Sequence, residues 1–351
     1  MESKNRMGTA PIQRLLLANS VPLMLSLLFS TLYNTVDSMF IARINEEALT
    51  AVSLAAPMQL LMDALGSGIA LGLNAAVSKA LGERNGEAVQ KTVSAGLFLA
   101  FCTWVILAAV GLTAVEPFFY WQSGGNERIA AYGSSYLSIC MIFSLGNMFQ
   151  WVFDRCLIAA GHSSLFLISL GGASLVNLVL DPIFIFGWFG LPAMGTAGAA
   201  IATMIGKTCG ALIALFLNLC CNREIPVRFT FRPDVHSLLG ILQVGTPTAF
   251  MQGLTSGAGI LLNTVFIALS PTAVAVAGIC NRIQNLALIG VHGICLGLIP
   301  IVAYNYGAKN RERIWGTLHW ALADGIVIFT VLLLGLEALP EQILSMFHAS
   351  E

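Results

Sequence analysis

Charge is scarce in this sequence of 351 residues, because Asp, Glu, Lys and Arg together make up 10% of it while 57% of the residues are hydrophobic. Soluble domains carry about 25% charged residues, so this composition excludes an ordinary soluble protein. Basic tracts with interleaved aromatic side chains are also missing, and we expect no nucleic-acid partner. The composition predicts an integral membrane protein whose neighbours are membrane lipids.

Enzyme and metal-site motifs are missing as well. The sequence contains no H-E-x-x-H, G-x-S-x-G, P-loop or dinucleotide-binding fingerprint, so we expect neither an enzyme nor a bound cofactor. Eight cysteines are scattered, nearly all of them in apolar runs, and none forms a C-x-x-C pair. This usage predicts buried, reduced thiols rather than a disulfide frame or a metal site.

Long apolar runs dominate what is present. Each is long enough to cross a bilayer, and each is apolar on every face rather than along one stripe, unlike the helices of a soluble bundle. The expected fold is therefore an all-α polytopic membrane protein. The predicted spans cover residues 15–42, 50–78, 92–115, 130–153, 164–187, 195–221, 237–269, 273–304 and 314–338.

The 17 Lys and Arg residues are distributed unevenly over the predicted loops. Only Arg43 and Arg128 fall in one set of loops, so the positive-inside rule predicts a cytoplasmic amino terminus. Lys207 and Arg282 lie inside spans, where each either faces a substrate, snorkels toward the membrane surface or pairs with a backbone carbonyl. The amino-terminal head and the alternate loops hold Lys4, Arg6, Arg14, Lys79, Arg84, Lys91, Arg155, Arg223, Arg228, Arg232, Lys309, Arg311 and Arg313.

An internal repeat appears when the chain is aligned with itself so that Pro22 falls on Pro247. At this offset GIALGLNAAVSKALGERNGE from Gly68 falls without a gap on GICLGLIPIVAYNYGAKNRE from Gly293. The offset spans six helices, an even number, so we expect two parallel six-helix lobes with a substrate site between them. Residues 1–225 form the predicted first lobe, and residues 226–351 form an incomplete second lobe, which gives nine helices of an expected twelve.

The first span carries two residues that do not suit a plain membrane anchor. Pro22 removes a backbone donor and is expected to bend or loosen the helix. Asp37 lies deep in the outer half, where an ionised carboxylate costs about 2.5 to 3.5 kcal/mol on insertion scales, so it is expected to face other helices or a wet cavity. Asn34, one turn earlier, is a hydrogen-bond partner on the same helical face.

A second carboxylate with an asparagine one turn away lies in the fifth predicted span. Asn177 and Asp181 are four residues apart, hence on one helical face, directly before Pro182. Because both spans run outward, Asp37 and Asp181 are expected at a similar depth. We interpret them as functional, the alternative being that they only brace bent helices. Asn147 and Thr203 are further polar residues in or near spans, with interhelical hydrogen bonding as their default role.

Taken in order along the chain, these motifs resemble the multidrug and toxic compound extrusion (MATE) transporters, most closely the DinF-like or MepA-like bacterial members. The resemblance covers the whole chain. The motifs that carry it are Pro22, the Y-N-x-V-D-S-x-F run to Phe40, Asn177-x-x-x-Asp181-Pro182, GTAGAAIAT at 195–203, AVAVAGICNRI at 273–283 and YNYGAKN at 304–310.

This resemblance implies an antiporter in the bacterial inner (plasma) membrane. It implies export of organic, often cationic compounds in exchange for protons or sodium ions. The implied ion-coupling residues are Asp37, Asn177, Asp181 and Thr203, with sodium as the one metal expected, at the first three. Pro22 matches the helix-bending proline, and Asn34, Asn147, Lys207 and Arg282 are candidate cavity-lining residues. The implied partner is a small organic substrate, with no obligate protein partner.

Two other interpretations of the sequence stay open. One is a lipid-linked saccharide flippase of the same superfamily, which is expected to line its cavity with several cations. The other is an inactive truncated fragment or a membrane scaffold.

The orientation leads to a first prediction. In a variant whose native cysteines are replaced by serine, a single cysteine introduced beside Asn85 is expected to react with a membrane-impermeant maleimide only from the cytoplasmic side. A cysteine beside Asn126 is expected to react only from the outside, because the positive-inside rule places the basic loops in the cytoplasm. Labelling of both positions from one side would show that the span map is wrong.

Overall fold

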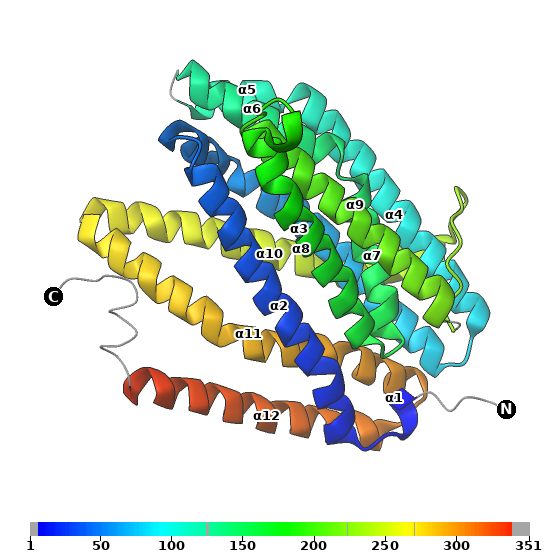
Figure 1. Cartoon of the computed structure of the whole chain (residues 1–351). Coiled ribbons are helices and arrows are strands. Elements are labelled where there is room, and N and C mark those ends of the chain that lie inside the picture. Colours follow the sequence, from blue (N-terminus) through cyan, green and yellow to red (C-terminus); the bar gives the residue numbers. More distant parts are fainter. Residues whose placement is uncertain (1–5, 124–125, 223, 270, 339–351) are drawn as a thin grey trace.

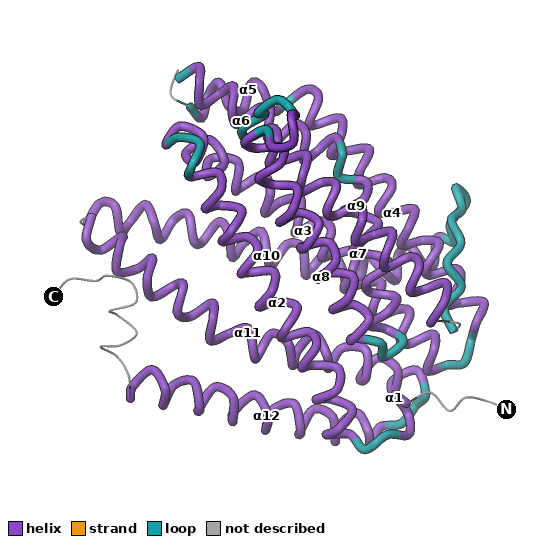
Figure 2. The backbone as a smooth tube through the Cα atoms, in the orientation of Figure 1, coloured by secondary structure: helices purple, strands orange, loops and turns teal. Residues whose placement is uncertain are grey.

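The computed structural model describes residues 6–123, 126–222, 224–269 and 271–338, and within these ranges the chain is helical with short connections and no strand (Figure 2). The helices, in chain order, are α1 (Arg6–Thr9), α2 (Ile12–Ala42), α3 (Glu46–Gly82), α4 (Gly86–Thr113), α5 (Val115–Gln122), α6 (Glu127–Ile142), α7 (Leu145–Ala159), α8 (Ser163–Phe186), the 3-10 turn η1 (Trp188–Gly190), α9 (Thr196–Cys221), α10 (Val235–Leu269), α11 (Pro271–Gly307) and α12 (Arg311–Ala338).

Seven of the helices in the described ranges are long and apolar enough to cross a membrane, or eight if the bent pair α6 and α7 forms one span. This confirms an all-helical, multi-pass membrane protein.

All eight cysteines are free thiols, as their scattered positions predict. The prediction that they are buried holds for Cys140 and Cys156. It is wrong for four others, because an apolar run in a membrane protein can face lipid as well as the protein interior. These four exposed thiols are Cys220, Cys221, Cys280 and Cys295.

The predicted span 130–153 differs most from the structure. It consists of α6 and α7, which meet at a 48° bend, and α7 continues to Ala159. Hydropathy assigns Arg155 to a loop, because the charged pair Asp154 and Arg155 ends the apolar run in the sequence. That assignment is wrong: Arg155 lies inside α7 with 6% of its surface exposed. The physical reason is that this end of α7 faces a polar cavity rather than lipid.

The helices form two groups that meet at one end and separate toward the other (Figure 1). Helices α10, α11 and α12 diverge from α2 to α9 toward the upper left of the view and converge with them at the lower right, beside α1. The turns that contain Arg84 and Lys309 lie at the end where α3 and α11 finish, which we call the basic end. Both residues have positive φ, 53° and 54°.

Two glycines allow α3 and α11 to cross at the basic end. A Cβ atom on Gly82 would collide with the carbonyl oxygen of Tyr304, and one on Gly307 would collide with the carbonyl oxygen of Lys79. The offset that places Pro22 on Pro247 also relates Gly82 to Gly307 and Lys79 to Tyr304. The crossing therefore consists of two equivalent contacts, in which a glycine of each helix packs on the backbone of the other. Only a residue without a side chain allows so close an approach.

Further glycines along the same two helices bring each against the first long helix of the other group. Gly72 of α3 packs on the backbone of Ile241 in α10, and Gly297 of α11 packs on Ser20 in α2. Either position would clash with its partner if it carried a Cβ atom. Small residues at such spacing let helices approach closely where no hydrophobic effect drives their association.

Helix α1 and the residue after it, Ala10, are hydrogen-bonded to α11 and α12. Arg313 Nη2 donates to the carbonyl oxygens of Met7, at 3.2 Å, and Ala10, at 2.8 Å. Asn305 Nδ2 donates to the same Met7 carbonyl at 3.2 Å. These hydrogen bonds join α1 to α11 and α12 at the basic end, next to the glycine crossing.

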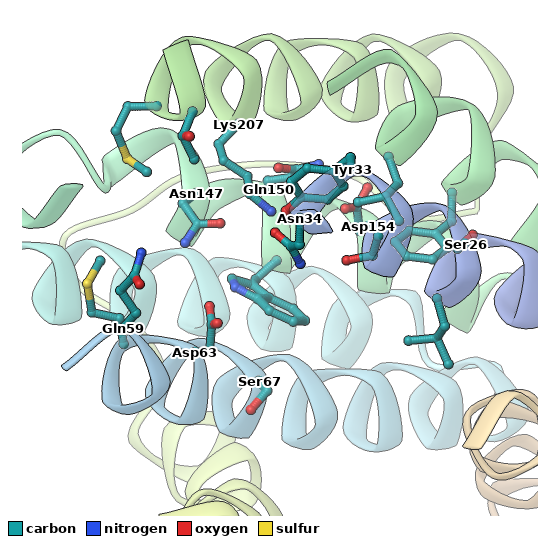
Figure 3. A pocket seen from close by; sticks show the side chains of 18 of the residues that line it. Ser26, Tyr33, Asn34, Gln59, Asp63, Ser67, Asn147, Gln150, Asp154 and Lys207 are labelled. Carbon is teal, nitrogen blue, oxygen red and sulfur yellow. The ribbon is translucent and has the colours of Figure 1, made fainter. Parts of the chain in front are cut away.

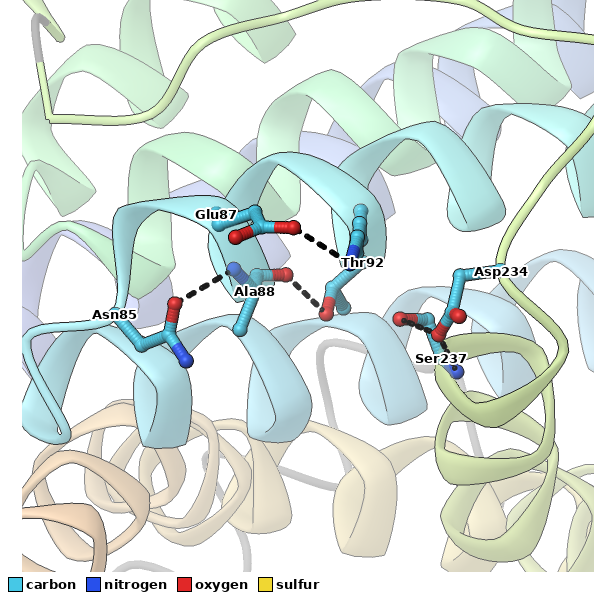
Figure 4. Close-up of polar contacts among 7 residues, drawn as sticks. Asn85, Glu87, Ala88, Thr92, Asp234 and Ser237 are labelled. Atoms are coloured by element: carbon cyan, nitrogen blue, oxygen red, sulfur yellow. Dashed lines mark hydrogen bonds and ion pairs between the residues drawn. The ribbon is translucent and has the colours of Figure 1, made fainter.

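Side-chain caps fix where two of the long helices begin (Figure 4). Asn85 Oδ1 accepts from the backbone N–H of Ala88 at 3.0 Å, at the start of α4. Asp234 Oδ2 accepts from the backbone N–H of Ser237 at 2.8 Å and from its hydroxyl at 2.9 Å, just before α10. Both bonds favour the ionised carboxylate and so lower the pKa of Asp234, and the bond from the backbone N–H has the larger effect. Each cap satisfies a donor that a helix leaves unpaired.

The crossing leads to a second prediction. Gly82→Ala places a methyl group where the Tyr304 carbonyl lies, so we expect a loss of roughly 1 to 3 kcal/mol of stability, as for other overpacked sites, and a lower melting temperature in detergent. Gly171→Ala is the matched control, because nothing lies within 4 Å of a Cβ atom there. Equal melting temperatures for the two variants would show that the close approach does not hold the helices together.

Candidate functional site

A polar cavity of about 350 Å³ lies among the helices α2, α3, α6, α7, α8 and α9 (Figure 3). Gln252 of α10 and Leu296 of α11 complete its wall, so the cavity also touches the second group of helices. Polar side chains predominate among the other lining residues, which include Ser26, Ser30, Tyr33, Asn34, Asp37, Gln59, Asp63, Ser67, Tyr136, Asn147, Gln150, Trp151, Asp154, Arg155, Thr203 and Lys207. In a chain with 10% charged residues, this concentration marks a site.

Helix α2 contributes Tyr33, Asn34 and Asp37, which helical spacing of three and four residues places on one face. Asn34 and Asp37 both line the cavity, as predicted from the sequence. The Oδ1 atom of Asp37 is buried without a hydrogen-bond partner in the described part of the chain. The carboxylate thus lies at the cavity between the helices, and one of its oxygens has no hydrogen-bond partner among the described residues.

Helix α8 brings its asparagine and aspartate into direct contact. Asn177 Nδ2 donates to Asp181 Oδ1 at 3.0 Å and to Thr203 Oγ1 of α9 at 3.3 Å. Asp181 is 1% exposed, and its Oδ2 has no partner among the described residues. A void of about 10 Å³, close to the volume that one water needs, lies beside Asn177, Thr203 and Lys207.

Pro22 lies directly before Leu23, the first residue of α2 in the cavity wall. The helix runs without a break from Ile12 to Ala42, and Ser26 Oγ donates to the Pro22 carbonyl oxygen at 2.7 Å. Because a proline has no N–H, the backbone ladder lacks one bond at this point. A weak point in α2 therefore adjoins the wall that carries Asp37.

Of the three remaining residues predicted to line the cavity, two are seen to do so. Asn147 and Lys207 line the cavity, and Lys207 Nζ lies 5.8 Å from the centroid of the Tyr33 ring. The side chain of Arg282 lies outside the described residues. Asp63, a weaker candidate in the sequence, also lines the cavity, whereas Asp324 of α12 does not.

Four cavity residues of α7 are not predicted from the sequence: Gln150, Trp151, Asp154 and Arg155. Each has at least one buried polar atom without a hydrogen-bond partner in the described part of the chain. A buried unsatisfied group costs about 1 to 3 kcal/mol. The available signal is the run QWVFDR at 150–155, which is too polar for a lipid-facing helix and which hydropathy treats as the end of a span.

Long apolar helices around one polar cavity define a membrane transporter. No group of three or more His, Cys, Asp or Glu side chains in the described ranges is arranged to hold a metal ion. The long apolar helices and the cavity between them are typical of a protein that binds a solute and moves it across the membrane.

A family model places the chain within that class. The MatE family model matches residues 22–183 and 247–351, more than half of the sequence, and the chain belongs to this family. The two matches begin at Pro22 and Pro247, the prolines that the internal repeat relates.

Curated relatives are named transporters or export proteins. The chain is 25% identical over 351 residues to an FAD transporter of Shewanella oneidensis, covering 99% of this chain and 77% of the relative. It is 22% identical over 344 residues to the multidrug export protein MepA of Staphylococcus aureus, covering 97% and 75%. It is 26% identical over 328 residues to a probable multidrug resistance protein NorM of Thermotoga maritima, covering 91% and 70%. These similarities agree with the MepA-like bacterial branch.

Solved structures share the fold. A MOP superfamily transporter of Pyrococcus furiosus superimposes with a TM-score of 0.89 at 25% identity, covering 100% of this chain and 77% of that one. A MATE family transporter in an outward-facing conformation gives a TM-score of 0.90 at 23% identity, with coverages of 100% and 77%.

Proposed function

We propose that this protein exports small organic compounds across the bacterial plasma membrane in exchange for protons or sodium ions moving inward. The observation that carries the proposal is the pair of carboxylates Asp37 and Asp181 in the amino-terminal helices. Each has one buried oxygen without a partner among the described residues, and Asp37 lies in the cavity wall. The names of the relatives, an FAD transporter and multidrug export proteins, support transport but differ in substrate.

The chemistry of these carboxylates suits an exchangeable cation. An ionised carboxylate away from water with an unsatisfied oxygen is costly, and a bound proton or a small hard cation removes that cost. The Asn177 amide already donates to one oxygen of Asp181, which leaves Oδ2 for the ion. The amide oxygen of Asn177 and the Thr203 hydroxyl are further oxygen ligands of the kind that sodium prefers.

An ion entering the cell supplies about 2.3 kcal/mol per charge per 100 mV of membrane potential. That energy is useful only if binding of the ion changes which way the cavity opens. We place the change in α2, where Pro22 weakens the helix just before the cavity wall, and we retain residues 1–225 and 226–351 as the two lobes that move. In the present conformation the glycine crossing closes the basic end, which we assign to the cytoplasm.

The flippase alternative gains one observation, because Arg155 joins Lys207 as a second cation in the cavity wall. Three carboxylates, Asp37, Asp63 and Asp154, line the same wall. A strongly anionic lipid-linked substrate would meet all three, so we favour the exporter.

The proposal leads to a third prediction. In proteoliposomes with an imposed proton or sodium gradient, Asp37→Asn and Asp181→Asn are each expected to reduce gradient-driven transport of a cationic dye such as ethidium at least tenfold. Asparagine keeps the size of the side chain but removes the charge that binds the ion. Dye fluorescence in the vesicles measures the rate.

Asp324→Asn is the matched control, because Asp324 is also an acid within a long apolar helix and also has a buried oxygen without a partner among the described residues. It differs in lying on α12, away from the cavity wall and from the amino-terminal helices that carry Asp37 and Asp181. It is expected to retain most of the transport rate. Gradient-driven transport at nearly the wild-type rate in Asp37→Asn would show that the ion does not act through this carboxylate.

A further inference from the structure

The linker between α9 and α10, residues 224–234, runs along the outside of the helices beside α4 (Figure 1). Its central run is R-F-T-F-R at 228–232, in which both arginines and both phenylalanines are exposed. The side chain of Phe231 is 68% exposed and that of Phe229 is 42% exposed. Exposed apolar side chains that are flanked by polar ones mark interaction surfaces, so we ask what this linker contacts.

Contacts with α4 hold the linker at a defined depth in the membrane. Ser94 Oγ donates to the backbone carbonyl oxygen of Arg228 at 2.6 Å. The Phe101 ring lies edge-on to both linker rings, with centroids 6.0 Å from Phe229 and 5.8 Å from Phe231. Both contact residues of α4 lie within a helix that is long and apolar enough to cross the membrane. The linker therefore lies against the side of a spanning helix instead of extending beyond its end.

The backbone of the linker suits the headgroup level rather than the hydrocarbon. Residues 226–233 form no backbone–backbone hydrogen bond within the described part of the chain. Besides the Arg228 carbonyl, the Arg232 N–H is bonded, to the Thr230 hydroxyl at 3.2 Å. Unbonded backbone groups are not tolerated against lipid hydrocarbon, whereas water and headgroups can supply the missing bonds. The linker is therefore an interfacial segment whose phenylalanines reach the boundary of the acyl chains.

The central part of the linker is purely basic. The two acids at its ends are used elsewhere, because Asp234 caps α10 and Glu224 lines a separate pocket at the basic end. Neither the Arg228 nor the Arg232 guanidinium forms a hydrogen bond or an ion pair in the ranges that the structure describes. Guanidinium groups bind phosphates through paired, charge-assisted hydrogen bonds. The charge and the depth of these arginines together indicate an anionic headgroup as their partner.

We propose that the linker is a binding site for anionic phospholipids. Phe229 and Phe231 enter the acyl-chain boundary beside Phe101, and Arg228 and Arg232 bind the phosphates of the headgroups. Apolar insertion and attraction to anionic lipid act together in such segments. A zwitterionic headgroup also carries a phosphate, but its own cation opposes the arginines, so the anionic lipid binds more tightly. The site is separate from the cavity and does not depend on which solute the cavity carries.

The test measures which lipid lies against the linker. In a variant whose native cysteines are replaced by serine, Phe231→Cys is labelled with bimane, and the full chain is reconstituted into nanodiscs. These contain equal amounts of phosphatidylglycerol and phosphatidylcholine, with bromine on the acyl chains of one lipid or of the other, because bromine quenches a fluorophore that it touches. Brominated phosphatidylglycerol is expected to quench the label roughly twofold or more strongly than brominated phosphatidylcholine, since the arginines concentrate the anionic lipid around it.

Leu112→Cys is the matched control for the label, because Leu112 lies near the other end of α4 and is 73% exposed. A label there is expected to be quenched equally by the two lipids. The double variant Arg228→Gln, Arg232→Gln is expected to bring the ratio at Phe231→Cys to about one, as no charge is left to select a headgroup. Quenching with both lipids brominated is expected to stay unchanged, which shows that the variant is folded and that its linker still lies in the membrane.

Two further variants separate charge from side-chain shape and location. Arg228→Lys, Arg232→Lys keeps the charge and is expected to recover most of the twofold ratio. Arg43→Gln removes an exposed arginine that follows the end of α2 and is expected to leave the ratio unchanged.

A ratio of about one in the chain with both arginines would overturn the proposal, as would an unchanged ratio in the double glutamine variant. Absence of quenching by either lipid would also overturn it, and would show that water or a protein partner covers the phenylalanines. The measurement uses neither a solute nor an ion gradient, so its outcome is independent of the proposed export function.

Discussion

The structure depends on the cost of placing an unpartnered charge where water is absent. A bilayer offers no hydrogen bonds, so each polar side chain within a spanning helix must find another helix or a wet space. Among the described residues, five charged side chains of the helices line one cavity: Asp37, Asp63, Asp154, Arg155 and Lys207. Outside faces carry residues such as Leu112 and Phe250, which are 73% and 68% exposed and suit lipid.

Glycine packing makes the cavity possible. The two groups of helices approach closely at the basic end, through Gly82 and Gly307, and separate toward the other end. The same residue type serves a second purpose inside the amino-terminal group, where Gly66 and Gly210 admit Trp151 and Gln150. Glycines thus allow both the close helix crossing at the basic end and the placement of Trp151 and Gln150 beside the cavity.

The sequence predicts what depends on local spacing. Hydropathy gives the all-helical fold, and the internal repeat relates the positions that touch at the crossing. The separation of four residues between Asn177 and Asp181 predicts their shared face, and the structure joins them with a hydrogen bond of 3.0 Å. The family resemblance adds Thr203, which accepts from the same amide.

What the sequence does not predict depends on contacts between distant segments. The bend between α6 and α7 carries no proline, and the charged pair Asp154 and Arg155 is indistinguishable by hydropathy from the end of a span. These side chains are buried because α3 and α9 surround them, which is tertiary information. Charge counting over loops therefore fails for a basic residue, such as Arg155, that lies close to the end of its helix.

The reciprocal contact of Gly82 and Gly307 also has a mechanical consequence. The two helices touch there backbone to backbone, with no side chain between them, so this contact would serve as the pivot if α11 rotated against α3. The 37 residues of α11 would then act as a lever of about 50 Å. By that geometry a rotation of about 10° at the pivot displaces the far end of the lever by roughly 9 Å. Such a rotation would turn a small adjustment of one contact into an opening as wide as a small solute at the opposite end of the helices.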